Sequence, residues 1–398
     1  MKILPDSIPR LRLAVALIVR NEADTLADTL ASVRPLADQI VVLDTGSTDA
    51  TMAVARQCGA VVGQYPWNDD FAAARNECLK AVSGDWVLWL DAGERLDADS
   101  AAPLRAFVDR QADRQHVYTL MIELPPATPT SATEQLAQPR LMPSGMKLQF
   151  GGQVRERLQP ALEATCLSLQ PAPGRILRHR REHDPARKFC KAQRDLRLAT
   201  LEAGQLGHWP VRLLLAAGEA LSSLSEPQNA REKFRQAIAL APAESTELLE
   251  AYYGLLTAVD GDQQSKHEAL TTCLEALRRF PFDAQLLLAL GKYLQTHRHP
   301  ELALRAFRAA ANFGRVEPQI WHLKQWKEVA AVCVTRILQA QAAAGNGHDE
   351  QPGVPDDRKF RIDGGSALEQ PAPHRDGGSP GAAVRGIGIT DEGPARRP

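Results

Sequence analysis

The sequence predicts an α/β domain with a mostly parallel sheet, followed by an all-α domain of helical repeats and a disordered tail. Three observations predict this organisation. Apolar runs of strand length alternate with helix-like segments up to about residue 105, a pattern of small and bulky residues recurs further on, and the chain from about residue 340 lacks apolar periodicity. We therefore expect domains at residues 1–185 and 186–339 and a tail at 340–398.

The predicted sheet depends on four runs that are apolar almost throughout, as strands buried on both faces are. Helical patterns separate them: Leu26, Leu30 and Val33 recur at helical spacing after the first run, and Asp69 or Asp70 is placed to cap the helix before the last. The four predicted strands lie within LRLAVALIV (11–19), QIVVLD (39–44), AVVGQY (60–65) and DWVLWL (85–90).

Three further segments precede the helical part. HVYTLMIEL (116–124) is expected to be another strand, and the Pro- and Thr-rich PPATPTSATEQLAQPR (125–140) is expected to be a loop. LQFGGQVRERLQPAL (148–162) is either a pair of strands or a strand and a turn. The basic stretch RILRHRREHDPARK (175–188) either contacts an anionic ligand or is a solvated approach to the first helix of the next domain, and we favour the second interpretation.

The helical part carries a repeat. Small residues where two helices meet, a bulky residue one turn later and a proline that ends the helix are typical of tetratricopeptide helix pairs, although an irregular helical bundle stays open. The copies start 39 and then 34 residues apart, and the third has no proline in register. The recurring positions are Ala230, Phe234, Ala237 and Pro242, then Ala269, Cys273, Ala276 and Pro281, then Ala303, Phe307 and Ala310.

The composition excludes several classes of protein. A net charge of −1 gives no electrostatic reason to expect a nucleic-acid partner. Six cysteines are scattered singly, so neither a zinc site nor a dense disulfide framework is indicated. The first apolar run is far shorter than the roughly 20 residues that a membrane span needs, and no export signal is visible. We expect a cytoplasmic protein.

Polar residues follow three of the predicted parallel strands. Ligands of such sheets bind at the carboxyl ends of the strands, which here are Asn21-Glu22, Asp44 and Asp91. Asp44 can accept a hydrogen bond from a base or a ribose, whereas Asp49 is more typical of a helix cap. There is no GxGxxG after the first strand and no GxxxxGK[ST] motif, so dinucleotide and P-loop sites lose their main support.

Four stretches carry a resemblance to a known family: LIVRNEADTLADTLASV, IVVLDTGSTDAT, YPWNDDFAAARNECLKAVSGDWVLWLDAGERL and FGGQVRERL. In order and spacing they resemble family 2 glycosyltransferases with the GT-A fold. More narrowly, they resemble a bacterial branch similar to lipopolysaccharide-core glucosyltransferases, which often carries tetratricopeptide-like helices. The resemblance covers roughly residues 11 to 185. It implies transfer of a sugar, most in keeping with a uridine diphosphate donor, to a saccharide, lipid-linked or protein acceptor in cell envelope polysaccharide biosynthesis.

The resemblance also implies roles for individual residues. Glu156 matches the acidic residue expected to act as general base, because an inverting transfer needs a carboxylate to take the acceptor's proton. Asp91 matches the first residue of the Asp-x-Asp motif that holds Mg²⁺ or Mn²⁺ against the diphosphate. The residues implied in donor binding are Asn21, Glu22, Asp44, Arg75, Asn76 and Asp91.

The chain departs from the family pattern at two places. Gly93 stands where the second metal-binding Asp is expected, and Arg155 stands where His usually precedes Glu156. Asp91 and Glu94 remain as two oxygen ligands for Mg²⁺ or Mn²⁺, and Arg155 could instead bind the donor diphosphate with its guanidinium. Restoring the motif with Gly93→Asp is then expected to tighten Mn²⁺-dependent donor binding. The competing hypothesis is a decayed, non-catalytic domain that acts as a scaffold through a protein partner on its helical repeats.

Overall fold

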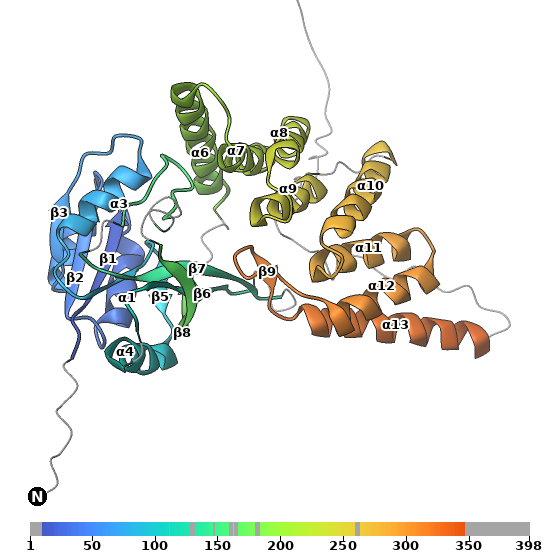
Figure 1. Ribbon diagram of the computed structural model, residues 1–398, viewed down its shortest axis with the longest axis horizontal. Helices are drawn as coiled ribbons and strands as arrows, with labels where there is room; N and C mark the ends of the chain where they lie inside the picture. The colour runs from blue at the N-terminus through green and yellow to red at the C-terminus, as the bar shows by residue number, and fades with distance from the viewer. Residues whose placement is uncertain are drawn as a thin grey trace, which may run out of the picture. The chain divides into compact units, whose positions relative to one another are not determined.

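The computed structural model describes residues 10–110, 112–126, 132–145, 148–158, 162, 166–179, 184–258 and 263–346 (Figure 1). All of them belong to the first of the two units into which the chain divides, residues 1–365. The last described helix reaches Asn346, beyond the predicted start of the tail at residue 340. The rest of that predicted tail, from residue 347 on, lies outside the described residues.

Within the described residues, nine strands form one mixed sheet with the order β3-β2-β1-β4-β7-β6-β8-β5, and β9 pairs with β7. The first four strands of this order are parallel, as their apolar runs predict. The strands are β1 Leu13–Val19, β2 Gln39–Asp44, β3 Val61–Gln64, β4 Trp86–Trp89, β5 Glu94–Leu96, β6 His116–Leu124, β7 Glu134–Pro143, β8 Ser168–Arg178 and β9 His322–Leu323.

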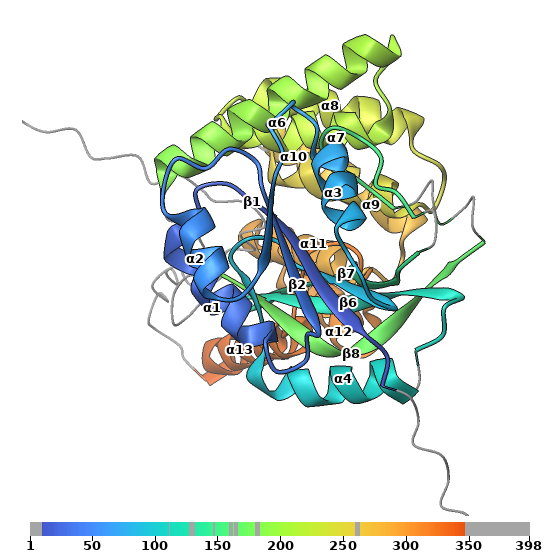
Figure 2. The same ribbon diagram turned by 90° about the vertical axis from the view of Figure 1, so that its left-hand side faces the viewer.

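Helices cover both faces of the parallel strands, and Figure 2 shows α1 and α2 on one side of β1 and β2 and α3 on the other. Because side chains alternate along a strand, Val15 and Leu17 pack in one apolar core and Ala16 in a second. Asp70 caps α3 by accepting a hydrogen bond from the Ala73 backbone at 2.8 Å. These helices are α1 Ala23–Val33, α2 Thr51–Gln57, α3 Phe71–Lys80, the short 3₁₀ helix η1 Ala98–Ser100, and α4 Ala101–Arg110.

The expectation that residues 125–140 form a loop is wrong for the described residues from Glu134 on. They begin strand β7, which pairs antiparallel with both β4 and β6 and so joins the parallel part of the sheet to the rest. The proline- and threonine-rich sequence of residues 125–140 does not indicate a strand, but hydrogen bonding to β4 and β6 on either side stabilises one. Of the two alternatives for residues 148–162, the described part holds no strand; it turns back on itself through an isolated bridge between Gly151 and Arg157.

The segment from Pro185 onward is helical, as predicted. In the repeat, Phe234 packs so closely on Gly218 and Gly254 that a Cβ on either glycine would lie 2.6 Å or less from its ring, and Phe307 packs on Gly291 in the same way. None of the helices in the described ranges is long and apolar enough to cross a membrane. The helices are α6 Pro185–Leu206, α7 Val211–Ser223, α8 Pro227–Leu240, α9 Thr246–Thr257, α10 Gln263–Arg279, α11 Ala284–Thr296, α12 Pro300–Phe313 and α13 Trp326–Asn346.

Candidate active site

The polar residues that follow the parallel strands meet at one edge of the sheet. Val19, the last residue of β1, is in register with Asp44, the last residue of β2, and Asp91 follows the neighbouring strand β4. The carboxyl ends of parallel strands share one edge of the sheet, so the parallel pairing alone explains why these residues lie near one another.

Asp44 is buried, with 1% of its surface exposed, and anchors the turn that follows β2. Its Oδ2 accepts hydrogen bonds from the backbones of Gly46 at 3.0 Å and Ser47 at 2.9 Å. Its Oδ1 is also buried, and among the described residues it has no hydrogen-bond partner. A buried carboxylate oxygen without a partner is costly unless a ligand supplies the donor.

Asn21 and Glu22 fasten the first loop to that turn. Asn21 has a positive φ of 53°, and its Oδ1 accepts from the Thr48 backbone at 2.8 Å while its own backbone donates to Ser47 Oγ at 2.8 Å. The Glu22 backbone donates to Thr51 Oγ1 at 2.7 Å. Both predicted donor-binding residues therefore shape the edge of the site.

Asp49 serves the local structure beside the start of α2, but the N-cap residue of that helix is Ala50 and not Asp49. Its Oδ1 accepts from the Thr51 backbone at 2.9 Å and its Oδ2 accepts from the Ala23 backbone at 3.3 Å. Hydrogen bonding from the Thr51 side chain, opposed by slight desolvation, lowers the pKa of this carboxyl below its usual value.

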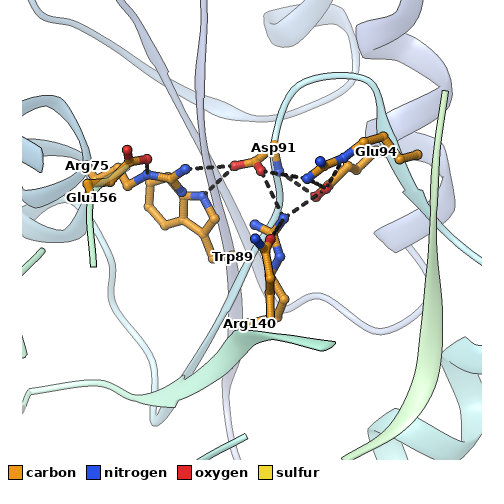
Figure 3. A network of polar contacts seen from close by, with 8 residues as sticks. Arg75, Trp89, Asp91, Glu94, Arg140 and Glu156 are labelled. Atoms are coloured by element: carbon orange, nitrogen blue, oxygen red, sulfur yellow. Dashed lines mark hydrogen bonds and ion pairs between the residues drawn. The ribbon is translucent and has the colours of Figure 1, made fainter. Parts of the chain in front are cut away.

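Asp91 is the centre of a charged network (Figure 3). Its Oδ1 accepts from Arg75 Nη2 at 3.0 Å and from Trp89 Nε1 at 3.3 Å. Its Oδ2 accepts from the Nη2 atoms of two arginines that the sequence reading did not include among the site residues, Arg140 at 2.9 Å and Arg178 at 3.3 Å. Desolvation alone would raise the pKa of the Asp91 carboxyl, but the positive charges of Arg140 and Arg75 hold that pKa well below its usual value.

Glu94, 1% exposed, is held by the same two arginines. Its Oε1 accepts from Arg140 Nη2 at 2.8 Å and from Arg178 Nε and Nη2 at 3.0 and 2.6 Å. Its Oε2 accepts from the Asp91 backbone at 2.9 Å. Asp91 and Glu94 were predicted as metal ligands, yet all four of their carboxylate oxygens already accept hydrogen bonds.

A divalent cation does not fit this donor set. Mg²⁺ and Mn²⁺ need several free, hard oxygen ligands. A carboxylate offers about four lone-pair positions, and at Asp91 these meet four donors. Across the described part of the chain, no group of three His, Cys, Asp or Glu side chains is arranged to hold a metal ion.

Glu156, the predicted general base, lies in the same network. Its Oε1 accepts from Arg75 Nε at 2.5 Å, and its Oε2 has no hydrogen-bond partner among the described residues. The Arg75 guanidinium also lies over two aromatic rings, 4.6 Å from the centroid of Trp89 and 5.1 Å from that of Phe150. Arg75 thus connects Asp91 at the end of the sheet to Glu156 in a distant loop.

Asn76 is the other residue of the predicted Arg-Asn pair. Its side chain binds the backbone of Phe150 in the segment that leads to Glu156. Its Nδ2 donates to the Phe150 carbonyl at 2.9 Å and its Oδ1 accepts from the Phe150 backbone N–H at 2.8 Å. Both polar atoms of the amide are therefore used within the protein. Its predicted contact with the donor stays a prediction; the observed role is to position Phe150 beside Arg75.

Arg155 faces away from Asp91 and towards the helices. Its φ of 50° turns the chain, and its Nη2 lies 2.5 Å from Glu219 Oε1 on α7 and 2.6 Å from Glu250 Oε1 on α9. The predicted contact of Arg155 with a donor diphosphate stays a prediction, and it gains no support from the observed contacts, which are with α7 and α9 and not with the network of Arg75 and Asp91.

The helices hold the rest of the loop from Gln153 to Arg157 as well. Arg157 Nη1 lies 2.5 Å from Glu247 Oε1 on α9, and Arg212 Nη1 on α7 donates to the Val154 carbonyl at 2.5 Å. The Gln153 backbone donates to Glu202 Oε2 on α6 at 2.9 Å. Glu156 is therefore the one charged side chain between Gln153 and Arg157 that turns towards Arg75.

Sequence reasoning missed Arg140 and set Arg178 aside as part of a solvated basic stretch. Arg140 is 3% exposed and lies within β7, which was expected to be a loop. In the sequence, the one indication of a buried strand at Arg140 is the apolar pair Leu141 and Met142 directly after it, and both residues are buried in the structure. Arg178 is the last residue of β8, so the interpretation as a solvated approach is wrong at this position; residues 180–183 of the same stretch lie outside the described residues.

Ligands of open α/β sheets bind at the carboxyl ends of the parallel strands, which is where the charged side chains lie in this protein. Residues 14–119 match the family model described as Glycosyl transferase family 2, so this segment has the sequence features of that family. The predicted resemblance is confirmed at this level. The narrower bacterial branch remains a prediction.

Two curated relatives extend the comparison. A TPR repeat-containing protein of Synechococcus elongatus is 44% identical over 99 residues, which cover 25% of this chain and 25% of the relative. An uncharacterized glycosyltransferase of Rickettsia felis is 30% identical over 112 residues, 28% of this chain and 39% of the relative. The matches thus span well under half the length of either relative.

Among solved structures, the chain is similar to glucosyl-3-phosphoglycerate synthase from Mycobacterium tuberculosis, determined in complex with Mn²⁺, uridine diphosphate and glucosyl-3-phosphoglycerate. The identity is 25%, and the match covers 29% of this chain and 43% of that one with a TM-score of 0.24. At so low a score, no residue correspondence is carried over to this chain.

Proposed function

We propose that this protein is a glycosyltransferase that moves a sugar from a nucleoside diphosphate donor to a hydroxyl of a saccharide, lipid-linked or protein acceptor. The observation that carries the proposal is the position of Arg75, which contacts Asp91 at the sheet edge and Glu156 in the loop at once. This arrangement brings the positive charge of the Arg75 guanidinium close to the Glu156 carboxylate, one oxygen of which is unused. The family match over residues 14–119 supports the same activity.

Asp44 is the proposed contact for the nucleoside. Its buried, unpartnered Oδ1 can accept a hydrogen bond from the base or the ribose. Asn21 and Glu22 would act indirectly, by holding the loop and the turn that surround it. A uridine base is the choice that the family resemblance favours.

Glu156 is the proposed general base of an inverting transfer. The acceptor oxygen would attack the anomeric carbon, the bond from that carbon to the diphosphate oxygen would break, and the diphosphate would leave with the electron pair. Oε2 of Glu156 would take the acceptor's proton, while Oε1 stays bonded to Arg75. The negative charge that develops on the leaving group needs positive charge nearby.

The domain division into residues 1–185 and 186–339 is part of the proposal, as is the tetratricopeptide character of the second part. The packing of Phe234 and Phe307 on helical glycines supports a repeated helix pair, and so does the TPR-containing relative. A role in the cytoplasm, in cell envelope polysaccharide biosynthesis and with a protein partner on the helices is what the resemblance suggests.

The test is donor hydrolysis and transfer by the full purified chain, assayed with a panel of uridine, guanosine and cytidine diphosphate sugars. We expect slow hydrolysis of at least one uridine diphosphate sugar in the absence of acceptor, and its loss in Glu156→Gln. A calorimetric titration with uridine diphosphate accompanies the assay. A folded chain that neither binds a nucleotide nor hydrolyses a donor would instead favour the decayed scaffold.

A further inference from the structure

We propose that the protein binds the diphosphate of its donor without a divalent cation, by means of the guanidinium groups of Arg75 and Arg178, which Asp91 and Glu94 hold in place. This inference rests on the proposed function and assigns the ligand of one part of that site: a diphosphate anion. It assigns Asp91 and Glu94 a role as positioning residues for arginines instead of metal ligands.

The first argument is the occupancy of the carboxylates. Arg140 Nη2 contacts Asp91 at 2.9 Å and Glu94 at 2.8 Å, and Arg178 contacts the same two carboxylates at 3.3 and 2.6 Å. Hydrogen bonds in which both the donor and the acceptor are charged are stronger than those between neutral groups. A metal would have to displace both arginines from a glutamate that is 1% exposed.

The second argument is the charge balance. The network holds three carboxylates, Asp91, Glu94 and Glu156, and three guanidinium groups. A metal site depends on surplus negative charge, and here the arginines have cancelled it. Arg140, 3% exposed, supplies the charge that compensates buried Glu94 and lies too deep to reach a ligand.

The third argument is the supply of unused donors. A guanidinium has five N–H groups in a fixed fork. Arg178 uses Nε and Nη2, and Arg75 uses Nε and Nη2, so the Nη1 group of each has no partner among the described residues. Their side chains are 31% and 12% exposed. These two arginines therefore keep accessible donors of the geometry that phosphate oxygens accept.

The fourth argument is the orientation of the guanidinium groups of Arg75 and Arg178. Arg75 lies over the ring of Trp89 at 4.6 Å, and Arg178 lies over the ring of Trp321 at 5.5 Å. Stacking on an indole holds a planar guanidinium without using its N–H groups. Trp321 comes from the segment between α12 and β9, so the helical part of the chain contributes directly to this site.

The experiment is calorimetric titration of the full chain with uridine diphosphate, uridine monophosphate and inorganic diphosphate, each in EDTA and in Mn²⁺. We expect uridine diphosphate to bind in EDTA with an affinity within about threefold of that in Mn²⁺. Arg178→Gln should weaken binding of uridine diphosphate and inorganic diphosphate by about 10-fold or more, the scale of a charge-assisted hydrogen bond, and leave the monophosphate much less affected.

Arg235→Gln is the matched control, because Arg235 is also paired with a glutamate, Glu268, but lies on α8. Thermal melting shows whether Arg178→Gln is folded. The comparison of uridine diphosphate binding in EDTA and in Mn²⁺ uses the unmodified chain, so its result does not depend on the folding of any variant. Binding of uridine diphosphate only in Mn²⁺ would overturn the inference and leave the proposed function intact. Absence of nucleotide binding under both conditions would overturn both. An unchanged diphosphate affinity in folded Arg178→Gln would remove Arg178 from the site.

Discussion

Arg157 Nη1 on the loop and Glu247 Oε1 on helix α9 lie 2.5 Å apart, so the residue next to the proposed base is tied to the helical part of the chain. Arg155, on the other side of Glu156, is tied to the helices through Glu219 and Glu250. Since Glu156 itself points to Arg75, its position depends on how its two neighbours are held. The helices are therefore expected to influence turnover although none of their residues touches Asp91 in the described network.

A charge reversal at this pair tests the coupling. Arg157→Glu places two carboxylates opposite each other and should lower turnover by about 3- to 10-fold, the scale of a partly exposed ion pair converted into a repulsion. Uridine diphosphate affinity should change little, because the donor contacts lie elsewhere. The double variant Arg157→Glu with Glu247→Arg should recover most of the turnover. The measurement is steady-state transfer with calorimetry; a double variant as slow as the single one would contradict the coupling.

Glu156→Gln keeps the size of the side chain and removes its basicity. Transfer should fall roughly 10²- to 10⁴-fold, as expected when a general base is lost, while donor binding stays within about twofold. The amide can still accept a hydrogen bond from Arg75, so the fold of the loop should persist. Glu244→Gln, at an exposed position, is the control. Near-normal turnover in Glu156→Gln would mean that the base lies elsewhere.

Asp44→Asn tests the nucleoside contact. The asparagine oxygen can still accept from Gly46 and Ser47, but its amide nitrogen then replaces the buried, unpartnered Oδ1, so an acceptor becomes a donor. We expect a loss of roughly 1–2 kcal/mol in binding of uridine diphosphate by calorimetry. The monophosphate should lose the same amount, since both share the nucleoside. If neither affinity changes in the folded variant, Asp44 is not part of the site.

Gly93→Asp distinguishes a metal site that lacks one carboxylate from the arginine-bound site. The earlier expectation was that it tightens Mn²⁺-dependent donor binding. The structure changes this expectation, because Gly93 has a φ of 82° and the oxygens of Asp91 and Glu94 are engaged. We now expect destabilisation of about 1 kcal/mol and no gain from Mn²⁺. Gly93→Asn is the control, since asparagine tolerates this backbone conformation and carries no charge; tighter Mn²⁺-dependent binding in the Asp variant alone would favour the metal site.

Asp283 should make the stability of the helical part depend on pH. Its carboxyl is 6% exposed, and burial raises its pKa to about 6 despite hydrogen bonds from the Leu286 backbone and Tyr253. The folded state therefore binds the proton more tightly than the unfolded state, whose pKa is near 3.8. Stability from this group is present below about pH 4 and is lost as pH rises towards 6 and beyond, by an amount on the order of 3 kcal/mol.

Urea unfolding of the unmodified chain and of Asp283→Asn at pH 4 and pH 7 measures this effect. Asparagine keeps one acceptor oxygen for the Leu286 backbone and can donate its amide N–H to the Tyr253 hydroxyl, but it does not ionise. The free energy of unfolding of the variant, relative to the unmodified chain, should therefore rise between pH 4 and pH 7. A difference between the two chains that is independent of pH would show that Asp283 titrates normally.

The parallel half of the sheet and the residues at its edge can be read from the amino-acid sequence. β1, β2 and β4 are apolar runs, and a run buried on both faces is readable from its own residues, whereas β3 at the edge of the sheet is partly exposed. Asp44 and Asp91 follow from the same reading, because each is the first polar residue after such a run. The helical character of the segment from Pro185 was readable for a similar reason, whereas its division into repeated helix pairs stays a prediction.

Which charged side chains pair with one another depends instead on the three-dimensional fold. Arg140 lies in β7, a strand that contains two prolines and directly follows a proline- and threonine-rich stretch, and Arg178 ends β8. Both contact Asp91 from more than 40 positions away in the chain. Arg155 could not be assigned from its place beside Glu156, since the two neighbouring side chains have different partners: Glu156 contacts Arg75, whereas Arg155 contacts glutamates on α7 and α9. A residue type at a strand end follows from local burial, whereas the partner of a charge depends on the pairing of distant strands and on loop geometry, which local sequence does not encode.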